Sequence, residues 1–397
     1  IWSRLVGSEM CIRDRNTGRD TNKLRYKTWL DFHHLNSNYQ FSENHFLLGG
    51  HSGWVILENE FLGTFELDVN NINQPSLTLD TNTYQIQVGE GLNTQTSAIL
   101  RLNPHIYTRK DNLIAKVGLS LQSDIVSEAK FYLFPDIEVS YSLFNDVFIP
   151  YAGWKGDVQR NTFNKIRLEN PFISEDIDLN NTAQRSNLYV GIRGSLSSKF
   201  TFNFSTNVER FDNFYFYVPD TSSSLENKFQ VTYNKVNRTT VLGEVTYQNG
   251  EKLKLAGKAE YFIYKLKIED DDDAKAWQRP DFMLTGSAIL DLSDKLIIRS
   301  DLYLVGSRNV YSYQIPTLSN NMVEDFVNNS HFDEISYNRY AFKLKPFVDM
   351  NLSAEYRYND KVSAFIRFNN FTAKRYQFWT NTPVQSINIF GGVTLSF

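Results

Sequence analysis

Apolar and polar residues alternate along much of this chain with a period of two. Within residues 113–121 one set of alternate positions is apolar, and the positions between include Lys116, Gly118 and Ser120. Similar runs occupy residues 253–263, 284–292, 296–304 and 362–369. Side chains of an extended chain point alternately to its two faces, so each run predicts a strand with one apolar face. The runs are about 9–11 residues long, which a tilted strand needs to cross a bilayer.

The connections between these runs fall into two length classes. Tight turns are predicted at residues 109–111, 145–146, 197–198, 249–250, 293–294 and 359–360, and Asn249-Gly250 is the strongest hairpin signal among them. Longer polar segments lie near residues 122–129, 159–185, 218–227, 266–281 and 306–343. Short and long connections alternate if residues 228–248 form one long strand. Outer-membrane barrels have short turns on the periplasmic side and long loops outside. A soluble β-sandwich or propeller would have shorter strands and no such sorting.

We therefore expect an all-β fold, an antiparallel transmembrane β-barrel of about 14–18 strands over residues 16–397. The mean hydropathy of −0.40 does not argue against it. Lipid-facing and lumen-facing residues alternate in such a barrel, so its average hydropathy is ordinary. The net charge of −4 shows no nucleic-acid footprint.

The first residues have a different character. The sequence LVGSEMCIRDR, Leu5 to Arg15, contains Cys11, the single cysteine of the chain. It resembles a translated sequencing adaptor, so residues 1–15 are expected to be an unstructured artefact that replaces the true start. A signal peptide would then lie upstream of the break. The alternative is a genuine disordered N-terminus.

The chain ends in an alternating strand, NIFGGVTLSF, with a terminal aromatic residue. Ile389, Val393, Leu395 and Phe397 share one face, which would meet lipid in a closed barrel whose last strand pairs with its first. The pattern resembles the C-terminal β-signal, here Val393, Leu395 and Phe397, by which the barrel-assembly machinery recognises outer-membrane proteins. The alternative is a buried final strand of a soluble sheet.

The last part of the chain also resembles a family. MNLSAEYRYNDKVSAFIRFNNFTAKRYQFW, then Pro383 and IFGGVTLSF, are similar to the last strands of TonB-dependent receptor-like barrels of Bacteroidetes. Asn369-Asn370-Phe371 and Tyr376 match the strand ending that precedes the last outside loop in that family. The resemblance implies solute uptake across the outer membrane of a Gram-negative bacterium, driven by TonB through displacement of a plug. It is patchy before residue 350.

Neither a plug nor a TonB-binding segment is visible in the sequence. The alternative is therefore a plugless barrel that acts as a passive pore or as a structural or assembly component of a surface complex. The expected partners are outer-membrane lipid and lipopolysaccharide, the barrel-assembly machinery, TonB if a plug lies upstream, and an unknown solute. No nucleic acid is expected.

No catalytic group stands out, so we expect no enzyme and no cofactor. His33 and His34 are adjacent and point to opposite faces of a strand, which does not suit a metal site. A run of five acids, Glu269, Asp270, Asp271, Asp272 and Asp273, provides oxygen ligands that suit Ca²⁺. A solvated, self-repelling loop tip is the competing explanation.

Two further groups of residues are candidates for function. Trp277 and Trp379 lie in predicted outside loops, where they would sit at the membrane interface or stack on a sugar. Eight charged residues are expected to point into the lumen, where they would pair with each other or line a polar path: Lys254, Lys258, Glu260, Asp291, Arg299, Asp301, Glu355 and Arg367.

Overall fold

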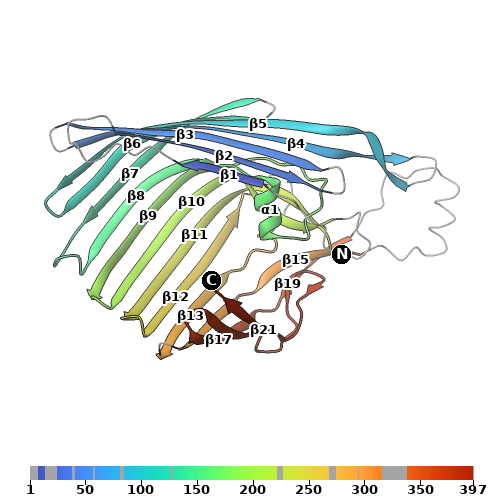
Figure 1. Ribbon diagram of the computed structural model, residues 1–397. Coiled ribbons are helices and arrows are strands. Elements are labelled where there is room, and N and C mark those ends of the chain that lie inside the picture. The colour runs from blue at the N-terminus through green and yellow to red at the C-terminus, as the bar shows by residue number, and fades with distance from the viewer. Residues whose placement is uncertain are drawn as a thin grey trace.

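The computed structural model shows one long curved sheet (Figure 1). It describes residues 8–13, 25–37, 41–56, 59–80, 85–126, 128–220, 227–267, 274–293, 295–314 and 338–396. The elements are β1 (Ser8–Arg13), β2 (Arg25–Asn36), β3 (Ser42–Ile56), β4 (Asn59–Asp80), β5 (Gln85–Lys110), β6 (Leu113–Ile125), β7 (Ala129–Tyr141), β8 (Ile149–Gln159), α1 (Phe163–Glu169), β9 (Thr182–Ser197), β10 (Phe200–Pro219), β11 (Phe229–Asn249), β12 (Leu253–Leu266), β13 (Phe282–Ser293), β14 (Leu296–Val305), β15 (Arg308–Gln314), β16 (Asn338–Leu344), β17 (Phe347–Asn359), β18 (Val362–Asn369), β19 (Gln377–Trp379), β20 (Thr382–Pro383) and β21 (Asn388–Leu395).

Seventeen strands make up the main sheet. Each of β1 to β13 pairs antiparallel with the next strand along the chain, and β14, β17, β18 and β21 continue the series. The hairpin of β15 and β16 extends β14 and β17 beyond the main sheet, and β19 and β20 form a small hairpin between β18 and β21. The prediction of an all-β antiparallel architecture with about 14–18 strands is confirmed.

The turns predicted at 109–111, 145–146, 197–198, 249–250 and 359–360 are confirmed as short connections between strands, and Asp294 of the turn predicted at 293–294 lies outside the described residues. The predicted long strand over 228–248 is β11, Phe229–Asn249. The connection expected near 122–129 is shorter than predicted, because β6 continues to Ile125 and β7 begins at Ala129. Much of the segment 306–343 lies in β15 and β16, and residues 315–337 lie outside the described part of the chain.

The two faces of the sheet differ in polarity, as the alternation predicts. On β6, Val117 and Leu119 are 56% and 50% exposed on the convex face. Lys116, directly before Val117, points to the concave face and pairs with Asp136 at 2.5 Å. Large contiguous apolar surface is unusual on a protein that meets only water, so the convex face requires an apolar environment. No helix in the described ranges is long and apolar enough to span a membrane.

Two expectations about the chain ends differ from the structure. Residues 8–13 form β1, which pairs with β2 from Ser8 opposite His34 to Arg13 opposite Trp29, although residues 1–15 were expected to be unstructured. The register also pairs β21 with β18, and no register joins β21 to β1 among the described strands. The described strands thus form a curved wall whose first and last members are not paired with each other.

Candidate functional site

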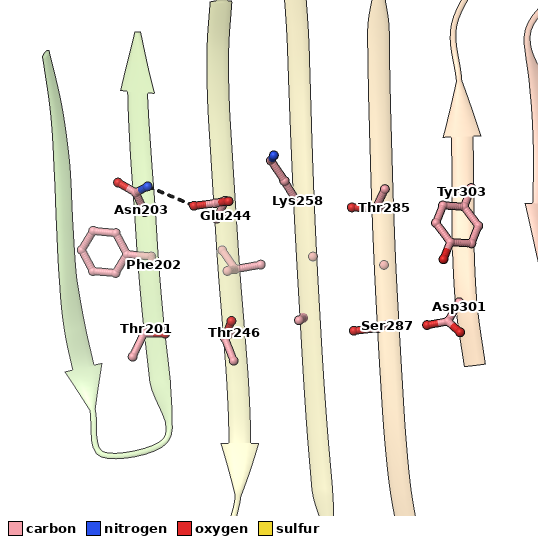
Figure 2. Close-up of a pocket in the computed structure, with 14 residues that line it drawn as sticks. Thr201, Phe202, Asn203, Glu244, Thr246, Lys258, Thr285, Ser287, Asp301 and Tyr303 are labelled. Carbon is pink, nitrogen blue, oxygen red and sulfur yellow. Dashed lines mark hydrogen bonds between the residues drawn. The ribbon is translucent and has the colours of Figure 1, made fainter. Parts of the chain in front are cut away.

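The concave face carries a polar groove across β10 to β14 (Figure 2). The groove has a volume of about 570 Å³. The registers bring Asn203, Glu244, Lys258, Thr285 and Tyr303 opposite one another in a single row across five strands. The Asn203 amide donates to the Glu244 carboxylate at 3.0 Å, as the dashed line in Figure 2 shows. A second row, one step away along the strands, contains Thr201, Thr246, Ser287 and Asp301.

The eight charged residues predicted to face the lumen all fall on this concave face by their registers. Lys258 and Glu260 form an ion pair at 3.0 Å along β12, and Arg299 and Glu355 pair at 3.0 Å between β14 and β17. The remaining four lie on the same face at other levels: Lys254, Asp291, Asp301 and Arg367. The arrangement therefore includes charge pairing across the wall, and a role in solute passage stays a prediction.

The end of the concave space where the long connections gather, the predicted outside end, holds a folded assembly that we call the loop cap. It consists of residues 160–181, 274–281 and 370–387, which are the β8–β9, β12–β13 and β18–β21 connections. Its apolar core contains residues from α1 and from the strands β2, β4, β10 and β11, which are not all neighbours in the sheet. Leu35, Phe163, Ile166, Tyr217 and Trp379 are all buried in this core. The loop cap thus packs against separated parts of the curved wall, and α1 lies within the concavity (Figure 1).

A buried carboxylate from β3 and an N-cap hydroxyl fix the start of α1. Glu43, from β3, is fully buried and accepts the backbone N–H groups of Phe163 at 2.8 Å and Asn164 at 2.9 Å. The Thr162 hydroxyl accepts the N–H of Lys165 at 3.0 Å, as an N-cap residue does. The first N–H groups of a helix have no partner within the helix, so these contacts supply what the helix end requires.

A buried ion pair holds the start of the same connection. Arg160 donates through Nε to Asp68 of β4 at 2.8 Å and through Nη1 to the Ser97 hydroxyl at 2.6 Å. Both charged side chains are at most 7% exposed. His45 lies 3.0 Å from the same carboxylate. Removing one member of a buried pair leaves an uncompensated charge, so Arg160 ties the loop cap to β4.

A second ion pair joins two connections of the loop cap. Arg279 forms a hydrogen-bonded ion pair with Glu169 at the end of α1, and the Tyr215 hydroxyl donates to the same carboxylate at 2.6 Å. The guanidinium of Arg279 lies 4.9 Å from the ring centre of Tyr215 and 5.4 Å from that of Tyr217. Burial alone would raise the pKa of Glu169, but Arg279 and the tyrosine hydroxyls outweigh it and lower that pKa. The pair is therefore ionised at neutral pH and connects the β12–β13 segment to α1.

The two loop tryptophans belong to protein cores and not to a membrane interface or an open sugar platform. Trp277 is 2% exposed and stacks edge-on with Tyr311 at 4.8 Å. Trp379 is 5% exposed and meets the Tyr217 ring at 4.7 Å. Both expected positions for these indoles require exposure, so the structure corrects them. Val393 and Leu395, which were predicted to belong to a C-terminal β-signal, are 65% and 59% exposed on the convex face.

Arg308 fixes the last connection of the loop cap. Its guanidinium donates to the carbonyl oxygens of Phe378 and, at 2.9 Å, Gln377, and it lies 5.1 Å from the ring centre of Phe347. Burial lowers the pKa of Arg308 to about 10, so the group is still protonated at neutral pH. It binds two carbonyl groups as a cation and so holds β19 in place.

The acidic run from Glu269 to Asp273 and the terminal Phe397 lie outside the described residues. Within the described ranges, no group of three or more His, Cys, Asp or Glu side chains is placed to hold a metal ion.

Sequence reasoning did not identify the polar anchors of the loop cap. Glu43 binds a residue 121 positions away, Arg160 one 92 positions away and Arg279 one 110 positions away. A pattern of neighbouring residues in the sequence does not reveal contacts between residues so far apart. Only the isolated charged residues in otherwise alternating strands, such as Glu43, offered a signal.

Comparison with solved structures gives the fold class. The chain is similar to the FrpB iron transporter from Neisseria meningitidis (F3-3 variant), with a TM-score of 0.66 and 11% identity over 99% of this chain and 63% of that one. It is also similar to the pyoverdine outer-membrane receptor FpvA from Pseudomonas aeruginosa PAO1, with a TM-score of 0.60 and 11% identity over 94% of this chain and 58% of that one. For the copper transporter OprC, the TM-score is 0.61 and the identity 11%, over 99% of this chain and 65% of that one.

No family model and no curated protein matches the sequence. The chain spans about three fifths of the length of these solved structures. At this level of identity the likeness establishes a shared fold, that of outer-membrane β-barrel receptors and transporters.

Proposed function

We propose that the chain forms part of the barrel wall of a receptor-like transport protein in the outer membrane of a Gram-negative bacterium. The observation that carries the proposal is the combination of an apolar convex face, a polar concave face and a loop cap at the outside end. A solute would bind at the outside loops and pass along the concave face. The likeness of fold to outer-membrane receptors supports this assignment.

The polar wall supplies the chemistry that a hydrated solute needs along a path. Hydroxyl and amide groups of Asn203, Thr285, Ser287 and Tyr303 can exchange hydrogen bonds with a solute that sheds part of its water. Ion pairs such as Lys258–Glu260 keep charges of both signs on the wall without a strong field of one sign. Such a surface favours passage of polar solutes over tight retention of one ion.

Active uptake is the mechanism that we favour. The solved structures of similar fold are a copper transporter, an iron transporter and a receptor for pyoverdine. The sequence resemblance of residues 350–397 to TonB-dependent receptor-like barrels of Bacteroidetes points to TonB as the energy-coupling partner. The wall is compatible with several classes of polar solute.

Assembly in the outer membrane gives the chain its other partners. Val393 and Leu395 lie on the convex face of the last strand, where the barrel-assembly machinery would read a β-signal completed by Phe397. The convex face as a whole would contact outer-membrane lipid and lipopolysaccharide.

The test begins with the intact gene, sequenced across residue 15. If residues 1–15 are an adaptor artefact, the genomic sequence will differ from LVGSEMCIRDR there. A signal peptide followed by a plug of roughly a hundred residues would support TonB-driven import. The complete protein is then expressed in matched strains with and without TonB, and uptake of candidate solutes is measured. Uptake that does not depend on TonB would refute active transport.

A plugless pore or surface-complex component is the second candidate. The described wall fits it equally well, because the polar concave face does not require a plug. Single-channel conductance of the purified complete protein separates the two cases. A steady open current without TonB indicates a passive pore, and a sealed barrel that co-purifies with a surface complex indicates a structural component.

A further inference from the structure

A second groove lies at the rim of the wall, where residues 374–377 of the loop cap meet the ends of β14 and β17. It has a volume of about 860 Å³ and opens where β14 and β17 reach their outside ends. Leu304 and Val348 pair directly in the register and line it, on the same face as the exposed Leu302. Lys345 and the neighbouring pair Lys374 and Arg375 line the same groove. It therefore joins an apolar floor to a basic rim.

The groove lies at the upper edge of the apolar band. The convex positions on β14 run from Leu296 to Leu304. These two residues are eight positions apart, which is about 26 Å along the strand at about 3.3 Å per residue. With the tilt of about 40° typical of these barrels, that gives a height of roughly 20 Å, close to the apolar band of about 25 Å. The basic rim follows directly above Leu304 and Val348 on the outside. That is the depth at which lipid headgroups meet acyl chains.

The rim has a charge of one sign. Its ten lining residues include no carboxylate. Among the described residues, none of Lys345, Lys374 and Arg375 forms an ion pair, whereas cations of the concave wall such as Lys258 and Arg299 do. Three cations around one groove, with no carboxylate among its lining residues, favour an anionic partner from outside the chain.

The segment that carries two of these cations is fixed in place. The Tyr376 ring stacks on Phe347 with 3.8 Å between ring centres, and its hydroxyl donates to Asp349 at 2.7 Å. The N–H of Phe371 donates to the Met350 carbonyl at 2.7 Å. Lys374 and Arg375 are therefore presented on an ordered backbone, so binding loses less conformational entropy than binding to a free loop.

We propose that this groove binds a phosphorylated, multiply acylated lipid of the outer leaflet, of the lipopolysaccharide type. Its phosphate groups would bind Lys345, Lys374 and Arg375, because Lys and Arg form charge-assisted hydrogen bonds to phosphate. Its acyl chains would lie on Leu304 and Val348. The proposal rests on the outer-membrane placement proposed above, and it adds a site that transport does not require.

The experiment uses the complete protein in lipid nanodiscs of phosphatidylcholine that contain a trace of diphosphorylated lipid A. Retained lipid A is counted by native mass spectrometry. The test variant is Lys345→Gln/Lys374→Gln/Arg375→Gln. The matched control, Lys199→Gln/Lys252→Gln/Lys361→Gln, removes the same charge at the turns of the opposite end. Dephosphorylated lipid A and inorganic phosphate serve as further probes.

We expect the wild type and the control to retain lipid A, and the test variant to lose about 10- to 100-fold in apparent affinity. Dephosphorylated lipid A should bind as weakly to the wild type as lipid A does to the test variant, and inorganic phosphate should compete poorly because it lacks acyl chains. Equal retention by test variant and wild type, or an equal loss in the control, would overturn the proposal. Insertion and solute uptake are measured on the same variants expressed in cells. A barrel that inserts and transports but retains no lipid A refutes only this site, whereas a barrel that does not insert refutes the proposed function.

Discussion

The assignment of the two faces can be tested by placing one arginine on each. Leu302 of β14 faces outward between Gly286 and Met350, and it is 37% exposed. Ser287 of β13 faces inward, directly opposite Asp301. Leu302→Arg and Ser287→Arg therefore introduce the same side chain at almost the same height, on opposite faces of adjacent strands.

The depth of Leu302 sets the expected cost. It lies six residues above Leu296, which is about 20 Å along the strand and roughly 15 Å in height for a strand tilted by about 40°. An apolar band of about 25 Å has its midplane near 12 Å, so Leu302 lies close to the middle. A lipid-facing arginine at the midplane costs about 2–4 kcal/mol. We expect about 2–3 kcal/mol for Leu302→Arg, a loss of roughly 30- to 150-fold in the folding equilibrium.

Equilibrium unfolding in urea of the complete protein, folded into lipid bilayers, measures this difference. Ser287→Arg should change the free energy of unfolding by less than about 1 kcal/mol, because the new guanidinium remains in the polar groove beside the Asp301 carboxylate. Equal destabilisation by the two substitutions would show that our facing assignment is wrong. A cost for Ser287→Arg that exceeds the cost for Leu302→Arg would reverse it.

Three further predictions concern the loop cap and the packing of the wall. Arg279→Met should destabilise the loop cap by about 1.5–3 kcal/mol, because the Glu169 carboxylate loses a charged hydrogen-bond partner. The hydrogen-exchange rate of the α1 amides should then rise while that of the β12 amides stays unchanged. An unchanged exchange rate in α1 would refute the role of the pair. The pKa of Glu169 is lowered from its ordinary value of 4.5, so the stability that it contributes is complete above that value and is lost as the pH falls through the lowered pKa. Protection of the α1 amides from hydrogen exchange should therefore be constant near neutral pH and decline only in acid. This decline in acid should be absent in Glu169→Gln. Gly191→Ala should lower the free energy of unfolding by about 1–3 kcal/mol, because the added Cβ would lie 2.4 Å from the Tyr151 ring. Gly257→Ala should be tolerated, because its added Cβ meets its nearest neighbour at 3.6 Å. Similar urea midpoints for the two variants would contradict this packing argument.

The sequence by itself determined the strands, their faces and the turns. Alternation with a period of two is a property of neighbouring residues, so Leu113–Leu121 or residues 253–263 indicate a one-sided strand without knowledge of any partner. Tight turns such as Asn249-Gly250 depend on backbone conformations that few residue types favour, and Gly250 has a φ of +60°. These local signals were sufficient for the antiparallel architecture and for placing Lys258 and Asp301 on the same face.

The tertiary structure decided what fills the outside end of the concave space. Trp277 and Trp379 looked like interfacial or sugar-binding residues, because sequence shows that an indole lies in a loop but not what packs on it. The anchors Glu43 and Arg160 act on groups about a hundred residues away, so no window of sequence contains both partners of either contact. Short-range alternation fixes a strand, but burial and charge pairing depend on which distant segments meet, and that is settled only when the sheet curves and its connections fold back onto it.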